Sequence, residues 1–271
     1  MASSTILLAQ LEVEDCTAEL FLNGAPVIRI APPKMHIQNA SAELYVVPGT
    51  NRLDVLVEPG SRPSTARSEV RELAFRPMRA TGRLIRFEEG VPGLVEHGEL
   101  LGEASFAWEE GRPERRVFPA EVGTQIEIPT ANGRWSFQDA PPLVLDDALR
   151  AEARALLAEV EQAIRRGDTD RFWSLTELQT RDVRRAYPAV TEPYLRGDLA
   201  TLFAHYRKAP DPVMPRDPAD HDFRLVAGDR MLQLVDRDYS TSFKLRDPGD
   251  GSAVSYRIML ARIDGKLRIV R

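Results

Sequence analysis

The sequence predicts two domains, an all-β antiparallel sandwich over residues 1–142 and an α+β domain over residues 143–271. Short runs that alternate apolar and polar side chains fill the first part, as in half-buried strands. After Pro141-Pro142 the apolar period changes to about 3.6 residues, which is typical of an amphipathic helix. The length of 271 residues also suits two domains of ordinary size. We therefore place the boundary at residue 142.

Tight turns separate the strands expected in the first domain. Asn23-Gly24 is a strong signal for a two-residue hairpin, and Pro48-Gly49 and Pro59-Gly60 end two further strands. Residues 61–68 are polar and predict a loop. We expect strands near residues 7–13, 19–22, 27–30, 42–47, 53–57, 69–75, 82–87, 99–108, 116–118, 125–128 and 135–137.

The second domain begins with the clearest element of the chain, a helix over Asp147–Arg166. Its apolar stripe includes Leu149, Ala153, Leu157 and Val160, and Asp146 or Asp147 can cap its first turn while Gly167 ends it. Further helices are expected over 169–187 and 192–208, followed by a proline-rich loop over 209–222. Strands are expected at residues 223–226, 231–235, 241–245, 254–263 and 266–270.

Two segments resemble known families. The second domain resembles the NTF2-like superfamily at its beginning and its end. The resemblance rests on the Asp147–Arg166 helix, the Gly167-Asp168 break, Thr169–Trp173 and the closing Ile258–Arg271 segment. This resemblance implies helices packed on a curved antiparallel sheet around a cone-shaped cavity, although the third helix and the proline loop depart from the pattern. In the first domain, residues 18–24 followed by 47–57 resemble accessory β-sandwich domains attached to glycosidases, but no catalytic barrel follows.

Composition narrows the functional classes. A net charge of −5 and a pI near 5.6 disfavour general nucleic-acid binding, which needs a basic surface. We expect no membrane span, no secretory signal and a cytoplasmic location. Cys16 is the single cysteine, so it is expected to be a small buried side chain rather than a disulfide partner.

No strong catalytic or cofactor motif is present. The phosphate-binding G-x-x-x-x-G-K and the dinucleotide-binding G-x-G-x-x-G patterns are missing, and the four histidines have no metal-binding spacing, so we expect no cofactor and no metal. The acidic stretch 96–99 with Glu103 would either bind a cation or form an exposed acidic edge. The same choice between a metal site and an ordinary loop applies to residues 217–222.

The second domain supplies the candidate pocket residues: Trp173, Tyr187, Tyr194, Asp198, His205 and Tyr206. Asp198 and His205 are seven residues apart and share a helix face, so one could act as a general base beside a tyrosine donor. The alternative is that the aromatic residues fill the core. Arg165-Arg166, Arg181, Arg184 and Arg185 would either meet an acidic partner or form a solvated face.

These observations favour a non-catalytic binding or adaptor protein that acts through protein–protein contacts, with a possible homodimer or small-molecule ligand. The alternative is a small-molecule enzyme, of isomerase, dehydratase or hydrolase type, that uses the cavity of the second domain. Carbohydrate recognition is a third reading, and it requires Trp108 or Trp135 to be exposed.

Overall fold

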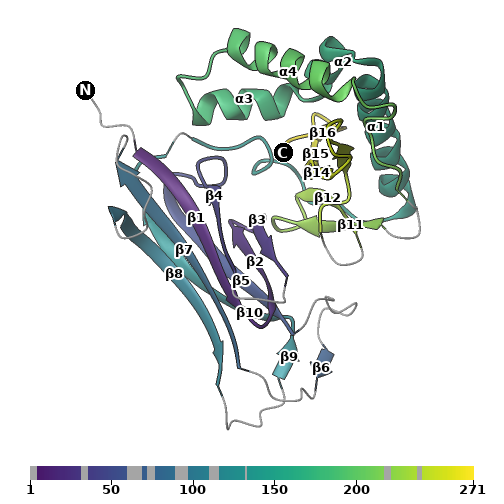
Figure 1. The fold of residues 1–271 in the computed structure, drawn as a ribbon. Coiled ribbons are helices and arrows are strands. Elements are labelled where there is room, and N and C mark those ends of the chain that lie inside the picture. The colour runs from purple at the N-terminus through teal and green to yellow at the C-terminus, as the bar shows by residue number, and fades with distance from the viewer. Residues whose placement is uncertain are drawn as a thin grey trace. The chain divides into compact units, whose positions relative to one another are not determined.

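The computed structural model describes residues 5–31, 36–59, 69–71, 77–88, 97–109, 116–131, 133–216, 221–236 and 240–271. The chain divides into two compact units, Met1–Arg134 and Trp135–Arg271. Antiparallel strands make up the first unit, and the second combines strands with four helices in its described residues (Figure 1). The boundary expected at residue 142 therefore lies inside the second unit. None of the described helices is long and apolar enough to cross a bilayer.

The N-terminal unit contains two four-stranded antiparallel sheets. One has the order β4 (His36–Ser41), β1 (Thr5–Glu14), β7 (Met78–Glu88) and β8 (Glu99–Trp108). The other has the order β10 (Ala120–Ile128), β5 (Gly49–Glu58), β2 (Thr17–Leu22) and β3 (Ala25–Ile30). A separate short pair joins β6 (Glu69–Arg71) to β9 (Arg116–Phe118). The hairpin predicted at Asn23-Gly24 is confirmed, because it connects β2 to β3.

The two sheets pack face to face through alternate side chains. Leu11, Leu20, Leu53 and Val55 are fully buried, as the period of two predicts. Glycine permits a close approach of the sheets at β7, where a Cβ built on Gly82 would lie 2.4 Å from Leu20 Cδ1 and 2.6 Å from Val55 Cγ2. The core of this unit therefore lies between the sheets.

A polar row crosses the other face of the first sheet. Gln10 Nε2 donates to Asn39 Oδ1 at 3.1 Å, and Arg83 Nη1 donates to Gln10 Oε1 at 3.1 Å. Arg83 also reaches Glu12 at 3.0 Å and Glu103 at 2.7 Å. One guanidinium thus links three neighbouring strands.

The strand expected at residues 42–47 is wrong, since β4 ends at Ser41 and a turn follows. Buried side chains supply the hydrogen bonds of this turn. Glu43 accepts from the Leu7 amide at 2.8 Å, and Asn51 accepts from the Val47 amide and donates to the Val47 carbonyl oxygen. These side-chain bonds replace a strand ladder. The predicted loop at 61–68 lies outside the described residues.

The described residues of the C-terminal unit form four helices and one main sheet. The helices are α1 (Asp147–Arg166), α2 (Thr169–Leu175), α3 (Glu177–Ala186) and α4 (Glu192–Tyr206). The sheet has the order β11 (His221–Val226), β12 (Met231–Asp236), β15 (Met259–Ile263) and β16 (Lys266–Ile269). A short hairpin joins β13 (Lys244–Arg246) to β14 (Ala253–Ser255).

The helix α1 is confirmed at both ends. Asp146 accepts from the Leu149 amide at 2.8 Å, and Gly167 adopts the left-handed conformation with φ 68°. Its apolar stripe enters a core shared with the sheet, including Leu149, Leu157 and Val160.

Three predicted elements of this unit differ from the structure. The helix expected over 169–187 is divided at Thr176, whose hydroxyl donates to the Phe172 carbonyl oxygen at 2.9 Å, a bond that bends helices. The strand expected over 254–263 is two strands in different sheets, β14 and β15. Residues 135–137 form a turn rather than a strand, with the Gln138 amide donating to the Trp135 carbonyl oxygen at 3.0 Å.

A buried ion pair anchors that turn. Arg271 Nη1 lies 2.8 Å from Asp182 Oδ2 of α3, and both side chains are almost fully buried. Asp182 also accepts from the Ser136 amide at 3.0 Å and from its hydroxyl at 2.9 Å. The Arg271 guanidinium lies 5.6 Å from the Trp135 ring centroid and 5.0 Å from that of Phe137. Residues 135–137 are therefore part of the C-terminal core.

Candidate functional site

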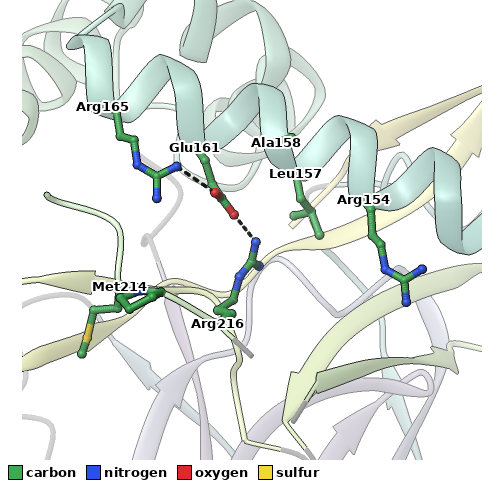
Figure 2. Close-up of a pocket in the computed structure, with 8 residues that line it drawn as sticks. Arg154, Leu157, Ala158, Glu161, Arg165, Met214 and Arg216 are labelled. Atoms are coloured by element: carbon green, nitrogen blue, oxygen red, sulfur yellow. Dashed lines mark hydrogen bonds and ion pairs between the residues drawn. The ribbon is translucent and has the colours of Figure 1, made fainter. Parts of the chain in front are cut away.

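A half-open hollow of about 380 Å³ lies in the C-terminal unit between α1 and the segment that follows α4 (Figure 2). Residues of α1 and of the 214–216 segment line it: Arg154, Leu157, Ala158, Glu161, Arg165, Met214, Pro215 and Arg216. This volume is within the range of small-molecule sites.

The spacing along α1 explains how these side chains come together. Arg154, Ala158, Glu161 and Arg165 follow one another by four, three and four residues, so they form one stripe along the helix. That stripe lies beside the apolar one, and buried Leu157 belongs to both the core and the hollow. Met214 and Pro215 add apolar surface from the opposite side. The hollow thus joins an apolar floor to a charged edge.

Glu161 is the centre of the charged edge. Its carboxylate pairs with Arg216, and its other oxygen accepts from Arg165 Nη1 at 2.9 Å (Figure 2). Arg165 also donates to Asp211 at 3.1 Å, which lowers the pKa of that carboxyl group although burial opposes the effect. The Glu161 carboxylate therefore pairs with two of the three guanidinium groups that line the hollow.

Arg216 is the most enclosed cation of the lining. Its side chain is 17% exposed, and its guanidinium lies 5.2 Å from the centroid of the Phe243 ring. Burial lowers the pKa of Arg216, and the negative charge of Glu161 opposes that shift. Its Nη1 is buried without a hydrogen-bond partner among the described residues. Glu161 is therefore its principal counter-charge.

Arg154 differs because it is exposed and its guanidinium takes part in no ion pair within the described parts of the chain. Its guanidinium lies 5.9 Å from the centroid of the Phe223 ring. Figure 2 shows Arg154 on the other side of Leu157 from Glu161. The cationic charge of Arg154 is consequently available to a bound anion.

The six residues predicted as a pocket do not line this hollow. Tyr206 is buried in the core, Tyr194 is 60% exposed, and Asp198 is exposed. Trp173 lies against Arg196, whose guanidinium is 4.2 Å from the ring centroid. Tyr187 is half-buried just after α3, where its amide donates to the Val183 carbonyl oxygen at 2.9 Å.

Two of these six predicted pocket residues, His205 and Tyr206, contact each other. The His205 and Tyr206 rings meet edge to face at 5.2 Å, and His205 Nε2 lies 3.2 Å from Asp247 Oδ2 in the turn after β13. The Gly249 amide and His205 lower the pKa of Asp247, while burial and the Asp247 charge raise that of Tyr206. No hydrogen bond or ion pair joins Asp198 to His205, both of which the structure describes.

The acidic residues proposed as metal ligands pair with arginines instead. Glu99 lies 3.1 Å from Arg86, Glu103 lies 2.7 Å from Arg83, and Asp222 lies 3.2 Å from Arg150. Residues 89–96 and 217–220 lie outside the described parts of the chain. Within those parts no three His, Cys, Asp or Glu side chains are placed to hold a metal ion.

The carbohydrate hypothesis requires an exposed Trp108 or Trp135, and that requirement is not met. Trp108 is 5% exposed and stacks on Phe118 at 5.7 Å, and Trp135 is 1% exposed. A sugar-binding platform needs an exposed ring, so neither tryptophan provides one.

Sequence reasoning missed most of the hollow. Arg165 is one of the helix arginines for which the sequence predicts either an acidic partner or a solvated face, and the Arg154–Glu161–Arg165 spacing is evident on the predicted helix. No sequence signal places Arg216 beside that stripe, because the contact is made across the tertiary fold. Comparisons with protein-family models, with curated proteins and with solved structures find no match for this chain.

Proposed function

We propose that this chain is a non-catalytic binding protein and that the hollow beside α1 binds a small organic anion. The observation that carries this proposal is the lining itself, where three guanidinium groups and one carboxylate border an apolar floor. Guanidinium groups bind carboxylates through paired, charge-assisted hydrogen bonds. The apolar body of a ligand would then contact Leu157, Met214 and Pro215.

The chemistry of the lining supports binding rather than catalysis. The described lining contributes no hydroxyl, thiol, imidazole or amine side chain that could act as a nucleophile. Glu161 is the one carboxylate of the described lining, and both of its oxygens are engaged by Arg165 and Arg216, so it has the contacts of a structural carboxylate. The enzyme alternative would instead need the six predicted pocket residues to converge.

A relationship to NTF2-like proteins remains part of the proposal for the C-terminal unit. It is supported by the order of elements, in which helices α1–α4 precede an antiparallel sheet. The adaptor role, in which the chain acts through contacts with another protein, also stays a prediction. Neither proposal is needed for the ligand test below.

Titration calorimetry of the full chain with octanoate tests the binding proposal. We expect one saturable site, weakened by up to about fivefold in Arg154→Gln, because one exposed charge interaction contributes up to about 1 kcal/mol. Arg184→Gln is the matched control, since Arg184 lies on α3 and pairs with Glu192 at 3.3 Å. Absence of binding, or equal binding by the Arg154 variant, would refute the proposal.

A further inference from the structure

We propose that Glu161 determines the charge of the ligand and makes the hollow selective for a monoanion over a dianion of the same length. This inference rests on the proposed function, because it concerns the same hollow. It adds the class of ligand, an organic monocarboxylate with an uncharged tail, and names the residue that enforces it.

Glu161 already holds the position that a second ligand carboxylate would take. One of its oxygens contacts Arg216, and the other accepts from Arg165 Nη1 at 2.9 Å. A ligand anion placed between these guanidinium groups would have to displace the Glu161 side chain, which is fixed to α1 and 17% exposed. An attached carboxylate competes at high effective concentration, so it excludes a free one.

Arg154 is then the exposed cation of the lining that is left for the ligand. It lies seven residues before Glu161 on the same stripe, which is about two helical turns, and it has no ion pair among the described residues. Between them the hollow is lined by Leu157 and Ala158. A ligand carboxylate at Arg154 therefore directs its body across apolar surface toward Glu161.

A second carboxylate at the far end of the ligand would meet the Glu161 carboxylate, which already occupies the donors that Arg165 and Arg216 turn toward it. Like charges a few ångströms apart repel, and the repulsion is stronger in a partly buried site than in bulk water. An uncharged end of the same length avoids that cost. Removal of the Glu161 charge would convert the repulsion into attraction, because Arg216 would lose its principal counter-charge and be left to receive the second carboxylate.

The test compares suberate with its monomethyl ester, which have the same chain length and differ by one charge. Calorimetry with the wild-type chain should show the ester binding about fivefold or more tightly than suberate. Glu161→Gln should abolish or reverse this preference, whereas Glu161→Asp, which keeps the charge, should retain it. Glu159→Gln is the control, because Glu159 is on α1 but pairs with Arg171 outside the hollow.

The outcomes separate the two proposals. If the wild-type chain binds neither compound, the proposed function fails and this inference fails with it. If both compounds bind equally to the wild type and to Glu161→Gln, the hollow is an anion site but Glu161 does not select the charge. If Glu161→Gln does not fold, the affinities of the wild type and Glu161→Asp are compared instead. Either chain binding suberate as tightly as the monomethyl ester would then overturn the inference.

Discussion

Gly82 lies at a close approach between the two sheets of the N-terminal unit. Its missing side chain leaves space for Leu20 and Val55, which would be 2.4 and 2.6 Å from a Cβ. We expect Gly82→Val to lower the free energy of unfolding by about 1–3 kcal/mol, because overpacking a filled core displaces its neighbours. Urea denaturation measures this change.

Gly197 provides the contrast within the same experiment. It lies inside α4 with no atom within 4 Å of a built Cβ. Gly197→Ala should raise the free energy of unfolding by about 0.5–1 kcal/mol, since alanine loses less backbone entropy in a helix. If both substitutions had the same effect, the close contact at Gly82 would not be real.

Cys16 shows how burial removes reactivity. The thiol is fully buried and donates to the Arg79 carbonyl oxygen at 3.4 Å. Desolvation raises its pKa to about 12, and the charges of Asp15 and Glu14 add to this shift. At pH 8 iodoacetamide should alkylate it at least about a hundredfold more slowly in the native chain than in urea, because only the thiolate reacts. Rapid labelling of the native chain would contradict this account.

At the scale of elements, α1 is the helix that connects the sequence to the candidate site. Its bounds follow from local signals, which are a capping aspartate, an apolar stripe and a terminal glycine. At the division between α2 and α3 the Thr176 hydroxyl donates to the Phe172 carbonyl oxygen, and between β14 and β15 the Tyr256 amide donates to the Phe243 carbonyl oxygen. Periodicity in the sequence cannot distinguish these cases from continuous elements.

Glu152 ties α1 to the β15–β16 hairpin. It accepts from Arg262 Nη2 at 2.7 Å and from the Leu267 amide at 3.2 Å, and the Arg262 hydrogen bond is the main cause of its lowered pKa. Its side chain is 41% exposed, so we expect Glu152→Gln to cost only about 0.5–1 kcal/mol.

The pH dependence of this cost has a definite sign. The pKa of Glu152 is lower in the folded chain than the ordinary value of 4.5, so the carboxylate stabilises the fold fully above that value. The contribution is lost as the pH falls through the lower, folded pKa. The gap between wild type and Glu152→Gln in thermal unfolding should therefore narrow below about pH 4.5, and a gap that widened there would disprove the assignment.

For the whole molecule, the change of period in the sequence indicates two units but places the boundary too late. Residues 135–142 look like a strand and a linker, yet Trp135 and Phe137 pack in the C-terminal unit beside the Asp182–Arg271 pair. Arg216 comes to the α1 stripe in the same way, through tertiary packing. Local patterns therefore predict α1 and most strands, but they do not predict the hollow.

The position of the boundary can be tested with two fragments. A fragment of residues 135–271 retains Trp135 and the Ser136 bonds to Asp182, whereas a fragment of residues 143–271 lacks both. We expect the shorter fragment to be less stable by about 3 kcal/mol or more, because it loses a buried aromatic side chain and exposes a buried charge pair. Equal melting temperatures by circular dichroism would place the boundary at residue 142 after all.

The proposed function requires that an anion enter the hollow beside α1. Chemical-shift mapping of the isotope-labelled full chain during an octanoate titration tests this most directly. We expect saturable shifts in the amides of α1 between Arg154 and Arg165 and in residues 214 and 216, with Pro215 silent because it has no amide proton. Shifts centred on Tyr194 and His205 instead, or no saturable shifts in α1, would contradict the account.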